Sequence, residues 1–220
     1  MNNIVVIAPH PDDETLGCGG TLLKEKKNGS KIHWIIATSI LEKYGWNKAK
    51  VLKRSKEIEK VAKTYKFNSV HYLDLPTTLL DNVSIVEIIA KISNIYKKIK
   101  PTIIFTPYNK DIHTDHQVIA KASIACSKWF RFPSIKKILC YETLSETHWS
   151  QNKGYFKPNV FIDISKFLDQ KIKIMKIYKS EINRFPFPRS EKTIRAKAMF
   201  NGSQSGFLAA EAFELLLERN

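Results

Sequence analysis

Cysteine is scarce in this sequence. The chain has 220 residues and three cysteines, Cys18, Cys126 and Cys140, with no CxxC spacing. An odd number of widely separated cysteines argues against a disulfide framework and against a zinc site built from thiolates. Cys18, which is small and flanked by glycines, is expected to pack in the interior.

Long hydrophobic runs are also missing. The first apolar run, residues 4–8, is too short for a signal peptide and has no basic segment before it. No stretch approaches the length needed to cross a bilayer, and we therefore expect a cytoplasmic protein. Because the chain also lacks repeats, low-complexity tracts and Gly/Ser linkers, we expect one domain spanning residues 1–220.

Acidic residues are few. The chain has 21 Asp and Glu against 36 Lys and Arg, a net charge of +15. Such an excess is typical of proteins that bind nucleic acid or anionic surfaces, and the segments KWFRFPSIKK (128–137) and RFPFPR (184–189) fit that hypothesis loosely. Much of the lysine falls on predicted helices, where it would cover a solvated face. We expect no nucleic-acid partner and leave peripheral contact with a membrane open.

Strand-like and helix-like patterns alternate along the chain. Apolar runs predict strands at 3–8, 31–39, 69–75, 102–107, 136–142 and 159–165. Helical patterns cover 14–27, 47–66, 84–98 and 113–129, and two or three more helices are expected to finish the chain. This alternation predicts an α/β fold, a Rossmann-like three-layer sandwich with a mostly parallel central sheet. Ligands of such folds bind beyond the C-terminal ends of the strands.

Two clusters of acids and histidines follow the first and the fourth predicted strands. Their members are His10, Asp12, Asp13 and Glu14 in the first cluster and Asp111, His113, Asp115 and His116 in the second. Both clusters should lie at the same edge of a parallel sheet. Helix capping explains one or two acids before a helix. It does not explain three acids beside a histidine, matched by a second such cluster.

The residue types point to a metal. A catalytic zinc site uses three N or O ligands and leaves one position for water. His10 and Asp13, three residues apart on a turn, are candidates for two ligands, and His116, at the start of a helix, for the third. The same ligands accommodate Fe²⁺. Asp12 would then act as a base toward water.

The second cluster holds a further pair. His113 and Asp115 are close enough in sequence to form an imidazole–carboxylate pair, which would fix a tautomer or raise the pKa of the histidine. Glu14 and Asp111 are expected beside the metal ligands rather than among them.

These motifs resemble those of a known family. APHPDDETLGCGGTL and DIHTDHQVIA are similar to the paired signatures of the PIG-L/LmbE family of zinc-dependent deacetylases, which remove the acetyl group from an N-acetylglucosamine unit. Weaker similarities at RSKE (54–57), YETLSETHW (141–149) and AAEAF (209–213) extend the resemblance over most of the chain.

The resemblance implies roles for individual residues. It implies zinc ligands at His10, Asp13 and His116, a general base at Asp12, oxyanion stabilisation by His113 with support from Asp115, and a substrate contact at Arg54. Some members carry a tyrosine at the position of Asp111 and others an aspartate, which indicates a subfamily. Tyr108 is out of register and is given no role. Asp81 is a candidate for binding sugar hydroxyls, with a turn or cap role as the alternative.

The expected function is therefore hydrolysis of the N-acetyl group of a GlcNAc-type amino sugar, giving acetate and a free amine. One alternative is an amidase that cleaves another amide of a sugar conjugate with the same metal residues. The other is a basic protein that binds nucleic acid or an anionic surface. Loops around 76–82, 130–135 and 143–155 and the C-terminal helices are expected to contact whatever carries the sugar.

Overall fold

The computed structural model describes residues 1–149 and 154–220. The strands are β1 (Asn3–Ala8), β2 (Lys31–Ser39), β3 (Ser69–Pro76), β4 (Ile103–Pro107), β5 (Lys137–Tyr141), β6 (Val160–Asp163) and β7 (Ala210–Glu218). Within the described residues they form one seven-stranded sheet in the order β3-β2-β1-β4-β5-β7-β6. The pairings among β1 to β5 are parallel, and β7 runs antiparallel to both β5 and β6.

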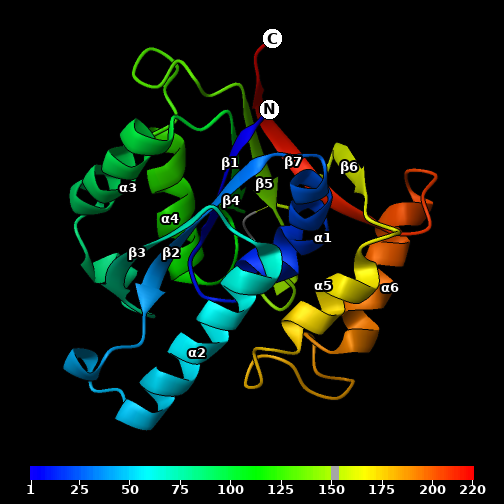
Figure 1. Ribbon diagram of the computed structural model, residues 1–220, viewed down its shortest axis with the longest axis horizontal. Helices are drawn as coiled ribbons and strands as arrows, with labels where there is room; N and C mark the ends of the chain where they lie inside the picture. Colours follow the sequence, from blue (N-terminus) through cyan, green and yellow to red (C-terminus); the bar gives the residue numbers. More distant parts are fainter. Residues whose placement is uncertain (150–153) are drawn as a thin grey trace.

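Helices cover both faces of the sheet. They are α1 (Asp13–Lys27), α2 (Lys48–Tyr65), α3 (Ile85–Ile99), α4 (Thr114–Ala125), α5 (Leu168–Met175) and α6 (Glu191–Ser203), with short 3-10 turns η1 (Glu42–Tyr44), η2 (Leu80–Asn82) and η3 (Thr147–Trp149). Figure 1 shows α3 and α4 on one side of the sheet and α1, α5 and α6 on the other. The predicted three-layer α/β fold is confirmed.

The central strand explains the continuous apolar run near the N-terminus. Ile4, Val6 and Ala8 pack into the core under α1, α2, α5 and α6, whereas Val5 and Ile7 pack into the core under α3 and α4. All five side chains are fully buried. A strand covered on both faces has no solvent side, and so it shows no alternation of polar and apolar residues.

The C-terminal segment differs from the prediction of helices to the end of the chain. Ala210–Glu218 is strand β7, although alanine, glutamate and leucine favour helices. It lies between β5 and β6, and Phe213 packs on Phe105 with ring centroids 5.2 Å apart. Pairing with two neighbours and burial of its first half outweigh local propensity. Helix α4 is also shorter than predicted and ends at Ala125.

In the described part of the chain, no helix is both long enough and apolar enough to cross a membrane.

Helix α1, which carries Asp13, lies very close to the sheet. A Cβ atom on Gly17 would lie 2.2 Å from Cδ2 of Tyr141. The ring of Tyr141 is buried, and its hydroxyl donates a hydrogen bond of 2.7 Å to the carbonyl of Ile7. Glycine is therefore required for this approach of helix to strand.

We expect Gly17→Ala to lower the free energy of unfolding by about 1–3 kcal/mol, because the added methyl group overpacks the contact with Tyr141. The effect runs against helix propensity, which favours alanine over glycine by about 1 kcal/mol. Urea unfolding would measure it, with Lys56→Ala on the exposed face of α2 as the control. Unchanged stability would mean that the ring of Tyr141 moves aside without cost.

Candidate active site

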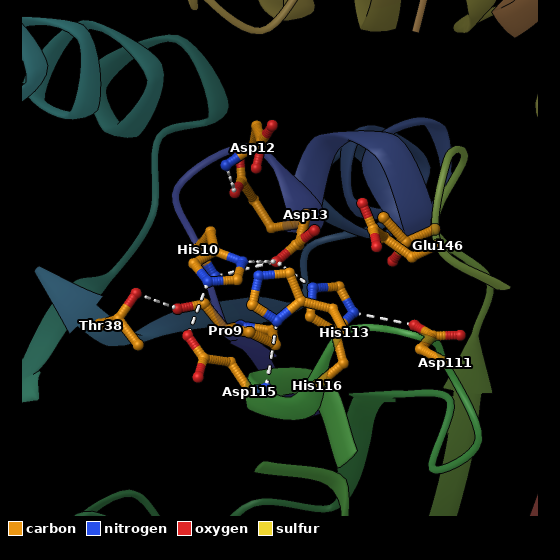
Figure 2. Close-up of polar contacts among 12 residues, drawn as sticks. Pro9, His10, Asp12, Asp13, Thr38, Asp111, His113, Asp115, His116 and Glu146 are labelled. Carbon is orange, nitrogen blue, oxygen red and sulfur yellow. Dashed lines mark hydrogen bonds and ion pairs between the residues drawn. The ribbon is translucent and has the colours of Figure 1, made fainter. Parts of the chain in front are cut away.

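The two predicted clusters meet at one edge of the sheet. His10, Asp12 and Asp13 follow β1, and residues 111–116 follow β4, which is hydrogen-bonded to β1. Figure 2 shows the imidazoles of His10, His113 and His116 gathered between the aspartates. Their ring centroids lie 4.6 to 5.4 Å apart. The juxtaposition expected from the parallel topology is present in the structure.

Three of these side chains form a set suited to a metal ion. Asp13 Oδ2 lies 3.4 Å from His10 Nδ1 and 3.3 Å from His116 Nε2. Two ligand atoms each about 2.1 Å from a tetrahedral ion lie about 3.4 Å apart, so the observed spacing fits one. The second nitrogens also have partners: His10 Nε2 lies 3.0 Å from Asp115 and His116 Nδ1 lies 2.8 Å from Asp111. Metal-binding histidines are usually oriented by such carboxylates.

A second group, His10, His113 and Asp115, is also compact enough for a metal. Its atoms are already used elsewhere, however. The Asp115 carboxylate accepts hydrogen bonds from the backbone N–H groups of Thr78 (2.7 Å) and Leu80 (3.1 Å) besides its contact with His10. His113 Nδ1 accepts the backbone N–H of Asp115 at 3.1 Å. The first set is therefore the better metal site.

The expected imidazole–carboxylate pair between His113 and Asp115 is wrong. His113 is the N-cap of α4, so its ring accepts the backbone N–H of Asp115 and forms no hydrogen bond with the Asp115 carboxylate. That carboxylate holds His10 and the segment between β3 and η2, where Thr78 has a left-handed φ of 63°. The Asp115 carboxylate thus positions the candidate metal ligand His10 and a loop, whereas His113 receives only the backbone N–H of Asp115.

The carboxylates and the imidazoles of the site shift one another's pKa values. Burial disfavours charge on His10, but hydrogen bonds with Asp115 and Asp13 raise its pKa to about 9. Burial likewise opposes charge on His116, and Asp13 and Asp111 nevertheless raise its pKa well above the usual value. Burial raises the pKa of Asp13, but the positive charge and hydrogen bonds of His116 and His10 lower it by more, so the net shift is downward. These carboxylates favour positive charge at the two imidazoles, which a metal ion would supply.

The pKa of His113 is shifted in the opposite direction from those of His10 and His116. Burial and the neighbouring His10 and His116 lower its pKa, and the neutral ring is therefore the stable form at neutral pH. Because Nδ1 accepts a backbone N–H, the proton of the neutral ring resides on Nε2. His113 lines the cavity described below, where this N–H group can serve as a hydrogen-bond donor.

Asp12 has an unusual backbone. Its φ of 141° lies in the region that favours glycine, and its N–H donates to Glu14 Oε2 at 3.0 Å. Glu14 is fully buried and also accepts hydrogen bonds from Thr15 and Tyr178. Strained conformations of this kind persist when the surroundings hold them, and they gather at functional sites. Glu14 therefore holds the backbone of Asp12 in place, and its predicted position beside the metal ligands stays a prediction.

The Asp12 carboxylate is suited to accept a proton. Burial and the nearby charge of Asp13 raise its pKa well above the usual value, and Arg189 opposes the shift. Arg189 Nη1 lies 3.3 Å from Asp12 Oδ2, and its Nη2 lies 3.3 Å from Glu181. Sequence reasoning missed Arg189, because it follows Asp12 by 177 residues and no spacing connects them. The only signal was the basic and aromatic segment 184–189.

A cavity of about 790 Å³ opens on this cluster. His10, Asp12, Asp13, His113 and His116 line this cavity, and so does one face of α2. Arg54 is part of that wall, where it donates to the carbonyl of Pro11 at 3.1 Å and pairs with Glu181.

Two expectations about substrate contacts are not met. Asp81 is exposed in η2 and does not line the cavity. Residues 130–135 follow α4 and do not line the cavity either, whereas Thr77 and Thr78 of the predicted loop 76–82 do. From the predicted loop 143–155, Glu146 lines it; residues 150–153 lie outside the described part of the chain.

Acid should weaken metal binding at this site. With the pKa of His10 at about 9 and that of His116 raised, a cation must displace their protons at neutral pH. The affinity for Zn²⁺, measured by competition with a chelator, should fall roughly tenfold per pH unit for each proton displaced. His148→Ala, outside the cluster, should keep the same dependence. An affinity that does not change between acidic and weakly basic pH would contradict the assignment.

The carboxylates behind the histidines should matter almost as much as the ligands. We expect Asp111→Asn to weaken zinc binding about 10- to 100-fold, because His116 loses its charged partner. Asp169→Asn, an exposed carboxylate on α5 that pairs with Arg195, is the matched control. Titration of both variants with zinc, alongside circular dichroism, separates the local effect from unfolding. Equal affinities would exclude Asp111 from the site.

Comparison with known proteins identifies relatives that cover almost the whole chain. Over 98% of this chain and 84% of the relative, the sequence is 25% identical to the diacetylchitobiose deacetylase of Thermococcus kodakarensis. The solved N,N'-diacetylchitobiose deacetylase of Pyrococcus horikoshii has a TM-score of 0.78 and 22% identity, covering 97% of this chain and 83% of that one. The conserved protein TT1542 of Thermus thermophilus has a TM-score of 0.79 and 24% identity, covering 100% and 97%. These two structures show the shared fold.

The family itself is shown by sequence. Residues 5–127, more than half of the chain, match the PIG-L family, which is described as GlcNAc-PI de-N-acetylase. The matched region contains both acid–histidine clusters and most of the cavity wall. This chain belongs to the PIG-L family of deacetylases.

Proposed function

We propose that this chain is a zinc-dependent N-deacetylase that removes the acetyl group of a GlcNAc-type amino sugar, giving acetate and a free amine. The observation that carries the proposal is one cavity that joins a His–Asp–His ligand set, a buried carboxylate beside it and a neutral imidazole. Each has a separate task in amide hydrolysis. The diacetylchitobiose deacetylase among the relatives acts on an N-acetylated sugar, which supports this substrate class.

The ligand set selects the metal chemistry. His10, Asp13 and His116 would hold zinc through two nitrogens and one oxygen, a combination common in catalytic zinc sites, and Fe²⁺ suits the same set. When bound, such an ion polarises the amide carbonyl and makes water more acidic.

Asp12 is proposed as the general base. Asp12 lines the cavity beside the candidate metal ligands, and its raised pKa gives its carboxylate a greater affinity for the proton of an attacking water. The same proton can then be passed to the nitrogen of the leaving amine. Arg189 holds the carboxylate in place from the other side. Because Glu14 fixes the backbone of Asp12, the base does not need to reorganise during the reaction.

His113 is proposed to stabilise the oxyanion that forms when water adds to the carbonyl. Its neutral ring presents the Nε2–H group, and the bond from the Asp115 N–H to Nδ1 fixes that tautomer. A donor of this kind contributes about 3–4 kcal/mol to the stability of a transition state.

A single domain covering residues 1–220 and a cytoplasmic location belong to the same proposal. The domain prediction rests on the length of the chain and on the absence of a linker-like segment in its sequence, and the location rests on the short apolar runs. Both stay predictions.

Acetate release from GlcNAc and diacetylchitobiose tests the function. We expect Asp12→Asn to lower kcat by about 10²- to 10⁴-fold and His113→Ala by about 10²- to 10³-fold, because each removes one step of proton transfer or charge stabilisation. Both variants should still bind zinc, and His148→Ala should keep full activity. A chelated enzyme should release no acetate.

Two outcomes would redirect the assignment. If the zinc-loaded enzyme released no acetate but cleaved another amide of a sugar conjugate, the amidase alternative would replace the deacetylase. If full acetate release survived Asp12→Asn, the assigned base would be wrong.

A further inference from the structure

Helix α1, whose N-cap is Asp12 and whose first residue is Asp13, is not a continuous helix. Cys18 departs from helical geometry, with a φ of −141° and a ψ of 18°, so α1 consists of two short segments joined at a kink. The segment before the kink, residues 13–17, carries the candidate ligand Asp13. So short a segment does not hold its shape alone, because forming the first helical turn is unfavourable. Its direction must therefore be fixed by contacts from the rest of the protein.

A buried ion pair contacts the backbone of α1 on both sides of the kink. Glu211 of β7 and Lys171 of α5 are 4% and 5% exposed, and Lys171 Nζ lies 2.6 Å from Glu211 Oε1. After the kink, the N–H groups of Gly20 and Thr21 donate to Glu211 Oε1 (2.9 Å) and Oε2 (2.7 Å). Before the kink, the carbonyl of Leu16 accepts a hydrogen bond of 2.8 Å from Lys171 Nζ. The ion pair therefore joins the two segments of α1.

The signs of the two charges suit the helix ends that meet at the kink. The N–H groups of Gly20 and Thr21 lie in the first turn of the second segment, where an anionic acceptor is favourable. The carbonyl of Leu16 lies in the last turn of the first segment, where a cation is favourable. In a continuous helix, the N–H of Gly20 would donate to the carbonyl of Leu16. Here Glu211 and Lys171 provide each of these two groups with a charged partner.

Stability alone gives little reason for such a pair. Removing two charges from water is costly, and an apolar pair of similar volume is often equally stable in the same place. A direct part in hydrolysis does not explain the pair either, since Glu211 and Lys171 are not among the described residues that line the large cavity. The contact of Lys171 with Leu16, however, lies about one helical turn from Asp13. The pair is thus placed to set the position of the segment that carries this ligand.

We propose that Glu211 and Lys171 are positioning residues for the metal site. By fixing the first segment of α1, they keep the Asp13 carboxylate 3.4 Å from the imidazole of His10 and 3.3 Å from that of His116. Functional groups must be held to within about 0.5 Å of their working geometry, so a small shift of this segment weakens the site while all its ligands remain present. The proposal rests on the proposed function for the presence of a metal ion between these three side chains.

Zinc affinity, measured by competition with a chelator, tests this role. We expect Glu211→Gln to weaken zinc binding about tenfold, because α1 loses an acceptor for one N–H and Lys171 loses its charged partner. Glu211→Asp keeps the charge but withdraws it from the backbone of α1. It should also weaken zinc binding, and it provides a second test if Glu211→Gln does not fold.

Glu142→Gln is the matched control. Glu142 is a buried carboxylate that pairs with Lys197 and contacts His148 and Asn201, none of which belongs to α1. The substitution therefore breaks a comparable ion pair away from the kink, and it should leave the zinc affinity of wild type unchanged. An equal loss of zinc affinity in Glu142→Gln and Glu211→Gln would overturn the proposal.

Urea unfolding of the metal-free variants separates positioning from a merely structural role. A structural pair would lower the free energy of unfolding but leave the zinc affinity of the folded protein unchanged, and that result would overturn the proposal. If wild type binds zinc and Glu211→Gln binds it more weakly, the positioning role holds even when no acetate is released. That second outcome would overturn only the deacetylase assignment. A wild type that binds no zinc would overturn the metal site and this proposal together.

Discussion

The arrangement at the active edge depends on one buried carboxylate. Asp13 accepts the backbone N–H of His10 at 2.8 Å and faces an imidazole nitrogen of His10 and another of His116. Removing a carboxylate from water is costly unless positive charge or hydrogen-bond donors compensate it. Here the compensation comes from two loops that are about a hundred residues apart in sequence. The need to compensate the buried charge of Asp13 therefore brings the three candidate metal ligands together on folding.

The backbone around that carboxylate is equally constrained. Strands β1 and β4 are neighbours in the sheet, so α1 and α4 both begin at the same edge. His113 caps α4, while Asp12 occupies the N-cap position of α1 in a strained conformation braced by Glu14. The side chains proposed to act in catalysis thus lie at helix starts, next to a central strand that is fully buried. Such supports hold reacting groups more accurately than free loops do.

The parts predictable from the sequence were those governed by local patterns. The alternation of apolar runs with helical segments predicted the parallel sheet, and both acid–histidine clusters then had to lie at one edge. Strand β7 could not be foreseen, since its residues favour a helix and only pairing with β5 and β6 makes it a strand. The contact of Arg189 with Asp12 could not be predicted for a related reason, because it joins distant segments that share no motif. The partners of Asp115 depend on how one N-cap side chain turns, which spacing alone does not reveal.

Asp115 connects the candidate metal site with the wall of the cavity. One carboxylate oxygen contacts the metal-ligand candidate His10 and the N–H of Thr78, and the other receives the N–H of Leu80. Thr77 and Thr78 belong to the wall of the substrate cavity. One side chain therefore couples the position of His10 to the position of this wall, and if an ion at His10 orders the wall, a ligand that holds the wall must favour the ion to the same extent.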